Sequence, residues 1–325
     1  MLQRPVIAIL AVIVAALAGC APSFLVTPVS SSTALREETV RAGSGWSPPK
    51  IVIIEVEGLL LNARTGGLLQ PQENAVSLFV QQLEKAARDQ SVVAVVLRVN
   101  SPGGTVAASD AMYDALLRFK SKRGIPVVAS AQDLAASGAY YVSCAADRIV
   151  VQPTSVVGSI GVIFNTFDIS GTLGLIGIRS EAIKSGPFKD MASPLRQMDP
   201  AERKLMQEMV DEFHGRFAAV VMSGRKLDSQ RLGELADGRI FTGEQAVKLG
   251  LADATGSLTD AINLAGELSG APGARVVMYR RPYGYGGSIY AGGAAPEPRA
   301  QNVVLNLLPE RALLPAGFYY LWDPP

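Results

Sequence analysis

A serine and a lysine whose types and spacing suit acyl transfer are the most informative residues of the sequence. Ser137 follows an apolar stretch and directly precedes Gly138 at the apparent start of a helix, so helix-end amides would lie behind its hydroxyl. A serine hydroxyl needs a base to become a nucleophile, and Lys189 is the candidate. A lysine can act as a base only where burial lowers its pKa from about 10.4 towards 7 or 8. The adjacent Asp190 would oppose this, but neighbouring side chains of an extended segment point to opposite faces.

Glycines and a second serine could supply the other groups that this reaction needs. Ser159 could accept a hydrogen bond from the lysine amine and so orient it. Gly103 and Gly104 directly precede a predicted helix, so their amides could bind the oxyanion of a substrate carbonyl, and Gly138 could offer a further amide. Each feature also has an ordinary explanation, since a serine can cap a helix, a lysine can be a surface residue and glycines can form a plain turn.

Strand and helix patterns alternate from Lys50 onward, and this order must position the candidate residues. Continuous β-branched runs between amphipathic helices indicate an α/β fold with a mainly parallel sheet that is covered on both faces. The sequence predicts strands over 51–56, 92–99, 126–130, 149–151 and 181–183, and helices over 75–87, 105–122, 137–146, 199–222, 243–249 and 257–268. The predicted helix over 199–222 should begin at Asp199, with Pro200 and Glu202 completing its cap.

The N-terminus predicts attachment to a membrane by lipid. Arg4 precedes the apolar run 6–17, which ends in small residues before Cys20, as is typical of a bacterial lipoprotein signal. This run is shorter than the roughly 20 residues of a spanning helix. We therefore expect a signal peptide over 1–19, lipid on Cys20, and a lipid-anchored, extracytoplasmic protein of the cell envelope on the periplasmic side of the inner or outer membrane. An uncleaved N-terminal anchor is the alternative.

Composition divides the remainder into three parts. Residues 20–48 are rich in Pro, Ser, Thr and Gly and predict a flexible tether, and residues 49–272 predict the globular domain. Residues 273–325 predict a C-terminal extension that ends in the aromatic run 318–322. Such an end could dock in a groove of its own or of a neighbouring subunit, or be a disordered terminus.

Charge and rare residues exclude several classes of partner. The net charge of +1 and the absence of a basic stripe argue against nucleic acid. One histidine and two cysteines leave a zinc site without enough ligands, so we expect neither metal nor cofactor. Cys144 lies among apolar residues, so we expect its side chain to pack in the core rather than to act as a nucleophile. His214 flanks an apolar helical stripe, so we expect it to have a structural role.

Five motifs, in this order, closely resemble bacterial signal peptide peptidase A in its short, single-domain form, over about residues 50–270. They are Asn100–Gly104, Ser137–Tyr141, Gly158–Val162, Lys184–Gly186 with Lys189–Asp190, and Gly238–Gly243.

The resemblance implies a Clp protease and crotonase type of fold with repeated β-β-α units. It also implies a serine endopeptidase with a Ser-Lys dyad, in which Ser137 attacks, Lys189 accepts its proton, Ser159 orients the amine and Gly103 supplies an oxyanion amide. Lys189 follows Ser137 by 52 residues, and about fifty separate the two in the family. The implied substrates are hydrophobic peptides such as residual signal peptides.

Short forms of the family are similar to ring or dome homo-oligomers in which serine and lysine can meet across a subunit boundary. A lipid anchor in place of the family's common transmembrane helix is a departure, and it leaves open the route by which the substrate reaches the site.

Two other functions are compatible with the same fold. One is a crotonase-like acyl-thioester enzyme, which would use the glycine amides to hold an enolate. The other is a catalytically silent scaffold in which Ser137 merely caps a helix.

Overall fold

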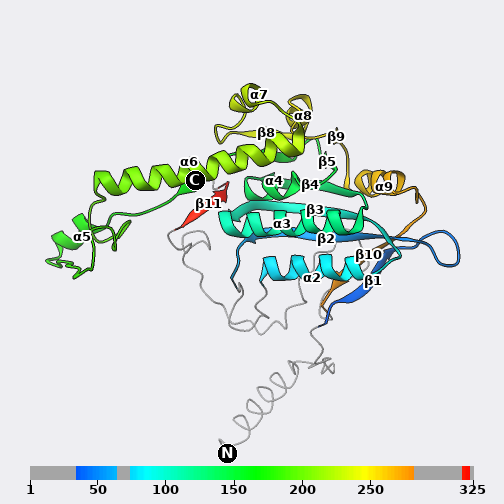
Figure 1. The fold of residues 1–325 in the computed structure, drawn as a ribbon, viewed down its shortest axis with the longest axis horizontal. Coiled ribbons are helices and arrows are strands. Elements are labelled where there is room, and N and C mark those ends of the chain that lie inside the picture. Colours follow the sequence, from blue (N-terminus) through cyan, green and yellow to red (C-terminus); the bar gives the residue numbers. More distant parts are fainter. Residues whose placement is uncertain (1–33, 64–73, 282–316, 323–325) are drawn as a thin grey trace, which may run out of the picture. The chain divides into compact units, whose positions relative to one another are not determined.

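One sheet forms the centre of the computed structural model, which describes residues 34–63, 74–281 and 317–322. Its main path follows the order β1-β10-β2-β3-β4-β5-β9, and every pair from β10 to β9 is parallel (Figure 1). The mainly parallel sheet that the sequence predicts is therefore confirmed. The strands on this path are β1 (Arg36–Arg41), β2 (Lys50–Leu60), β3 (Val92–Thr105), β4 (Val127–Ala136), β5 (Arg148–Val151), β9 (Ala254–Thr255) and β10 (Arg275–Arg280).

Helices cover both faces of this sheet, as predicted. Successive side chains of β2 alternate between two buried clusters, because side chains of a strand point to opposite faces. Val52 and Ile54 belong to the larger cluster with α2, α3 and α4, whereas Ile51 and Ile53 belong to the cluster with α9. The helices are α2 (Ala75–Arg88), α3 (Val106–Arg123), α4 (Gly138–Ser143), α5 (Ser170–Leu175), α6 (Pro200–Arg225), α7 (Ser229–Gly233), α8 (Gly243–Lys248) and α9 (Leu258–Leu268).

Four short strands gather where β3 and β4 end. They are β6 (Val156–Gly158), β7 (Ile163–Phe164), β8 (Ile240–Thr242) and β11 (Phe318–Leu321). β6 pairs in parallel with the last residues of β4, and β8 pairs with β6. β11 pairs with the last residues of β3 and also with β7. The carboxyl ends of parallel strands are where open α/β sheets bind ligands, so these strands border the expected position of a site.

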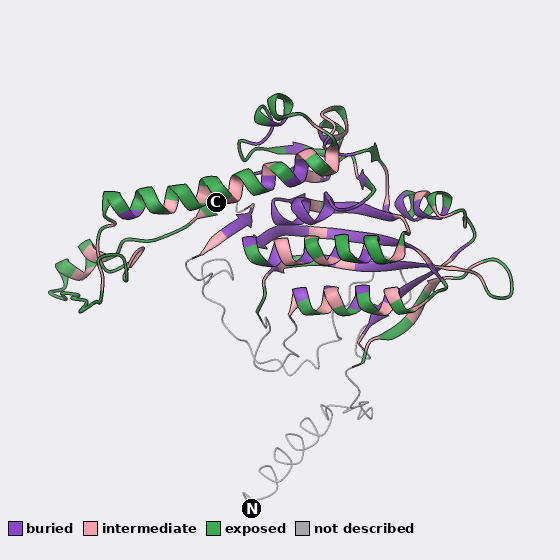
Figure 2. Cartoon of the chain, in the orientation of Figure 1, coloured by how far each residue is buried: buried purple, intermediate pink, exposed green. Residues whose placement is uncertain are grey.

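Residues 165–209 form an exposed arm that comprises α5, a loop and the first turns of α6. Figure 1 draws α5 beside the start of α6 and α4 beside its end, and Figure 2 shows the arm mostly exposed and the sheet buried. The predicted cap of α6 is confirmed: Asp199 and Glu202 form a capping box, and Pro200 opens the helix. Within the described ranges, no helix has the length and hydropathy that a membrane span requires.

The structure corrects two sequence predictions. Residues 181–183 form no strand, and Ile183 is fully exposed within the arm, since no sheet edge lies there to pair with it. Residues 36–41, placed by the sequence within a tether over 20–48, form β1 and pair with β10. The sheet therefore extends beyond the predicted limits of 49–272 at both ends. β1 has few apolar side chains and is held by backbone pairing, whereas β10 carries a run of buried apolar residues. The earlier part of the tether, 20–33, lies outside the described residues, as does Cys20.

Candidate active site

Ser137 occupies the one-residue junction between β4 and α4. Its φ of 52° and ψ of −118° lie in a region that non-glycine residues rarely adopt, at a cost on the order of 1–3 kcal/mol. The backbone is held in this position from both sides: the N–H of Ser137 donates to the carbonyl of Gly158 at 2.7 Å, and its carbonyl accepts from the N–H of Tyr141 at 2.9 Å. Strained backbone at a junction of this kind points to a functional constraint rather than to a plain turn.

The hydroxyl of Ser137 is buried and has no hydrogen-bond partner within the described part of the chain. Its side chain makes no capping bond to α4, so the structure does not support the explanation that this serine merely caps a helix. A buried hydroxyl without a partner costs free energy, on the order of 1–3 kcal/mol, and such an exception calls for a reason. A nucleophile that awaits its base is one such reason.

The three predicted oxyanion glycines lie together beside this serine. A Cβ added at Gly103 would lie 2.7 Å from the amide nitrogen of Gly138, and one added at Gly138 would lie 3.2 Å from the amide nitrogen of Gly104. Gly103 also has a φ of 101°, which favours glycine. Its own N–H donates to Oγ of Ser101 at 3.1 Å, so the Gly103 amide already has an acceptor.

Ser159 sits at the matching position of the neighbouring strand. Ala136 of β4 pairs with Gly158 of β6, so Ser137 and Ser159 each follow directly after a paired residue. Both serines have a positive φ, and Ser159 is buried, with its N–H donating to the carbonyl of Arg239 at 2.8 Å. The structure thus brings Ser137, Ser159 and the candidate oxyanion glycines together at the ends of β3, β4 and β6.

Lys189 lies elsewhere, in the loop of the arm between α5 and α6, and its side chain is exposed. Ion pairs fix this loop to the first turn of α6. Arg196 Nη2 contacts Asp190 Oδ1 at 2.8 Å and also bonds Glu202, while Lys184 Nζ contacts the same Asp190 oxygen at 2.6 Å. The hydrogen bond from Arg196, followed by that from Lys184, lowers the pKa of Asp190. The carboxylate that could have neutralised Lys189 is therefore engaged by other cations.

The length of α6 separates Lys189 from Ser137 within one chain. Near its end, α6 contacts α4 through Phe217, whose ring centroid lies 5.2 Å from that of Tyr141. Glu202, to which the loop is tied, precedes Phe217 by fifteen residues, which correspond to about 22 Å of helix. Proton transfer requires about 3 Å between heavy atoms. A single copy of the chain therefore does not bring the predicted dyad together.

Two other side chains that could be reactive, those of Cys144 and His214, are packed or hydrogen-bonded within the fold. Cys144 is buried against α6, and burial raises the pKa of its thiol to about 12. His214 Nε2 lies 2.9 Å from the carbonyl oxygen of Ala236. The described residues contain no group of three or more side chains that could hold a metal ion.

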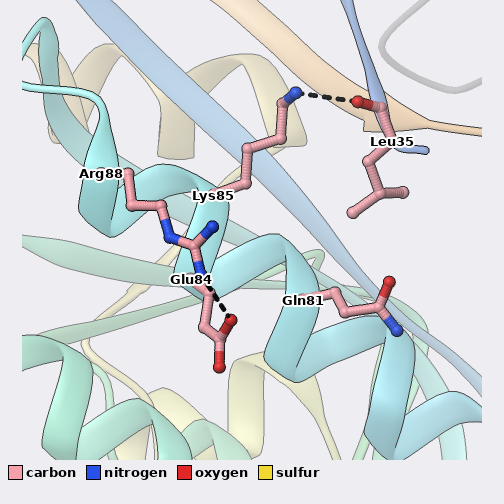
Figure 3. A pocket seen from close by; sticks show the side chains of 5 residues that line it. All are labelled: Leu35, Gln81, Glu84, Lys85 and Arg88. Atoms are coloured by element: carbon pink, nitrogen blue, oxygen red, sulfur yellow. Dashed lines mark hydrogen bonds and ion pairs between the residues drawn. The ribbon is translucent and has the colours of Figure 1, made fainter.

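A pocket of about 410 Å³ lies away from Ser137, at the outer side of α2 (Figure 3). Lys85 Nζ donates to the carbonyl of Leu35 there at 2.8 Å, and Arg88 pairs with Glu84 at 3.2 Å. None of the predicted site residues lines it.

Sequence reasoning missed two contributors to the candidate site. Ser101 Oγ donates to the carbonyl of Gly58 at 2.6 Å and accepts from the Gly103 amide, so it fixes the glycine turn. Tyr320 of β11 lies against Gly103 and Gly138, whereas the sequence predicts for its aromatic run only a docking segment or a disordered terminus. The Ser-Pro-Gly-Gly motif could have indicated the first contributor, whereas no local signal indicates the second.

Comparison with known proteins finds two family models that match this chain. The model of peptidase family S49 matches residues 119–271, and the Clp protease model matches residues 52–157. A relative from Enterococcus faecium, provisionally described as signal peptide peptidase SppA, is 36% identical over 249 residues, which cover 77% of this chain and 72% of the relative. A provisionally described protease from Synechocystis is 35% identical over 68% of this chain and 75% of its own length. The serine protease SPPA of Arabidopsis chloroplasts is 30% identical over 69% of this chain and 33% of its own length.

Proposed function

Because the chain belongs to peptidase family S49 and is a serine peptidase with a Clp protease-like fold, we propose that it cleaves hydrophobic peptides with Ser137 as nucleophile and Lys189 of a second copy as base. Residual signal peptides are the proposed substrates, in line with the description of the Enterococcus relative. The observation that carries the assignment of Ser137 is its buried hydroxyl, which has no partner in the described structure. The family match favours peptide hydrolysis over the acyl-thioester chemistry of the crotonase-like alternative.

The proposed reaction follows from the order of groups around Ser137. The Lys189 amine of the second copy removes the hydroxyl proton as Oγ attacks the peptide carbonyl, and Ser159 accepts a hydrogen bond that aims the amine. The amides of Gly104 and Gly138, with that of Gly103 if it exchanges its bond to Ser101, stabilise the oxyanion. The protonated lysine then donates to the leaving amine, and water releases the acyl group from Ser137 by the reverse path. No metal or cofactor takes part in this scheme.

The need for a second copy also agrees with the surface of the arm, which exposes several large apolar side chains. Exposed apolar patches mark contact surfaces rather than ordinary solvated surface. Burial of the arm against another copy would supply the water-poor surroundings that an amine base requires. We therefore propose a homo-oligomer, as a ring or dome, in which the arm of one copy reaches the Ser137 site of the next. The exposed apolar residues of the arm are Phe167, Ile169, Leu175, Ile176, Ile178, Ile183, Phe188, Leu195, Leu205 and Met209.

The proposed location rests on the N-terminal sequence alone. Lipid on Cys20 would hold the enzyme at the periplasmic face of a membrane, where signal peptides remain after secretion. Labelling of the cells with a radioactive fatty acid tests this, with Cys20→Ala as the control. Label that persists in this variant, or is absent from both proteins, would contradict the anchor.

Substitution of the two dyad residues tests the catalytic proposal. Ser137→Ala and Lys189→Ala should each abolish hydrolysis of an apolar fluorogenic peptide while the melting temperature and assembly size stay unchanged. Lys204→Ala is the matched control, because Lys204 also lies in the arm and its side chain is 80% exposed. Activity retained in either dyad variant would overturn the assignment.

A further inference from the structure

The motif Gly238–Gly243 is the one shared motif to which the proposed reaction gives no part. It comprises the end of the turn between α7 and β8, the whole of β8, and the first residue of α8 (Figure 1). β8 pairs with β6, and Ile240 lies opposite Gly158, the residue before Ser159. The motif therefore lies directly beside Ser159, so we asked what its side chains do there.

The main chain of the turn 237–239 continues this pairing beyond the start of β8. The N–H of Ser159 donates to the carbonyl of Arg239 at 2.8 Å, and the N–H of Gly238 donates to the carbonyl of Ile160 at 3.1 Å. Ser159 has a φ of 50°, a conformation that residues with a side chain rarely adopt and keep only where their surroundings hold them. Two main-chain hydrogen bonds to one turn thus hold Ser159 and its neighbour.

The side chains of Asp237 and Arg239 close this turn over Gly238. Asp237 Oδ1 accepts from the N–H of Arg239 at 3.1 Å and from its Nε at 2.8 Å. Gly238, between them, has a φ of 90°, which favours glycine. The hydrogen bond from the Arg239 side chain, followed by that from its main chain, lowers the pKa of Asp237 to about 2, so the pair is ionised at neutral pH. The preceding residue is connected to α6, because His214 Nε2 lies 2.9 Å from the carbonyl oxygen of Ala236.

We propose that Asp237 and Arg239 are positioning residues of the peptidase, because their ion pair fixes the turn that holds Ser159. This proposal rests on the proposed function, in which Ser159 aims the Lys189 amine at Ser137. A displacement of about 1 Å in such a group can slow an enzyme on the order of a hundredfold. Both side chains of the pair are exposed, and exposed ion pairs contribute little to global stability. Loss of the pair should therefore loosen the turn without unfolding the protein.

Amide hydrogen exchange at Ser159 in the full-length protein tests this positioning without any catalytic step. In Arg239→Ala, exchange of the Ser159 amide should accelerate about fivefold, the largest effect that one exposed ion pair commonly has. Arg239→Lys keeps a cation for Asp237 and should restore part of the protection. Arg231→Ala is the matched control, because Arg231 forms a similarly exposed ion pair with Glu234 within and just after α7, and it should leave this amide unchanged. Equal exchange at Ser159 in Arg239→Ala and the unsubstituted protein would overturn the proposal.

A double-variant cycle tests whether the pair acts through Ser159. Arg239→Ala should lower kcat for the fluorogenic peptide about fivefold and leave KM unchanged, because the substrate contacts do not change. Ser159→Ala should lower kcat at least as much, and Arg239→Ala added to it should cause no further loss, because the hydroxyl that the turn positions is already absent. If the arginine supported only the fold, the two losses would multiply. Losses that multiply, or an unchanged kcat in Arg239→Ala, would overturn the proposal.

Failure of the proposed function would look different. If Ser137→Ala retains activity, the assignment of the nucleophile fails, whereas exchange at the Ser159 amide still decides whether the ion pair fixes this residue. If Ser137→Ala is inactive and Arg239→Ala keeps both its kcat and its protection at Ser159, the nucleophile stands and the positioning role of Asp237 and Arg239 fails.

Discussion

Mixing of two inactive variants should restore activity if the serine and the lysine come from different copies. The perturbation combines Ser137→Ala, which keeps the lysine, with Lys189→Ala, which keeps the serine. Each variant alone lacks half of the dyad in every site. After dissociation and joint reassembly, some sites will hold Ser137 from one copy and Lys189 from another.

The structure sets the size of this effect. The loop of Lys189 is fixed to the start of α6, about 22 Å of helix away from the contact between Phe217 and Tyr141, so a site within one chain contributes nothing. In a closed ring with head-to-tail contacts, each site takes its lysine from one defined neighbour. With equal amounts of both variants, random assembly should therefore return about one quarter of the activity of the reassembled unsubstituted enzyme.

The assay is hydrolysis of the fluorogenic peptide after reassembly, with the distribution of the two variants checked by native mass spectrometry. Reassembled single variants serve as the controls and should stay inactive. Mixed assemblies without recovered activity would refute the sharing of the site. A dependence of recovery on the product of the two variant fractions, with its maximum at equal amounts, would support it.

Three further outcomes test the surroundings of the site. Arg196→Ala should lower kcat roughly tenfold, equivalent to about 1.4 kcal/mol, because the released Asp190 carboxylate can pair with Lys189, the proposed base, and Arg196→Lys should rescue part of the loss. Burial would raise the pKa of Asp89, but hydrogen bonds led by that from Lys50 outweigh it and lower the pKa from 3.8 to about 2. The stabilisation of the fold by the ionised Asp89 carboxylate is complete above about pH 4 and is lost as the pH falls through 2. The melting temperature should therefore fall over that range, and Lys50→Met should make its dependence on pH flatter. An equal slope in both proteins would contradict this. Because burial raises the pKa of Cys144 to about 12, iodoacetamide at pH 8 should modify its tryptic peptide only after denaturation, and rapid modification of the folded protein would be inconsistent with this packing.

The strands and helices near the site could be predicted because their local signals agree with their tertiary surroundings. The β-branched runs of β2 and β3 are buried on both faces, and such strands read as continuous apolar segments. The cap of α6 depends on the nearby Asp199, Pro200 and Glu202 alone. The turn at Ser137 could be located as well, but its strained backbone and its unpartnered hydroxyl depend on the pairing of β4 with β6.

The remaining features depend on contacts between distant parts of the sequence. β11 joins a strand more than 200 residues earlier, and an aromatic run carries no information about which edge it will meet. β1 is rich in charge, and its backbone pairing with β10, supported by the ion pair of Glu38 with Arg280 at 3.2 Å, was not visible in composition. The separation of Lys189 from Ser137 follows from the direction of α6, which a spacing of 52 residues does not specify.

The central claim is that Ser137 is the nucleophile, and labelling of the native, assembled enzyme with a fluorophosphonate probe tests it most directly. Mass mapping of the modified peptide should place the phosphonyl group on Oγ of Ser137, and the Ser137→Ala protein should remain unlabelled. Modification of another residue, or equal labelling of the Ser137→Ala protein, would contradict the account.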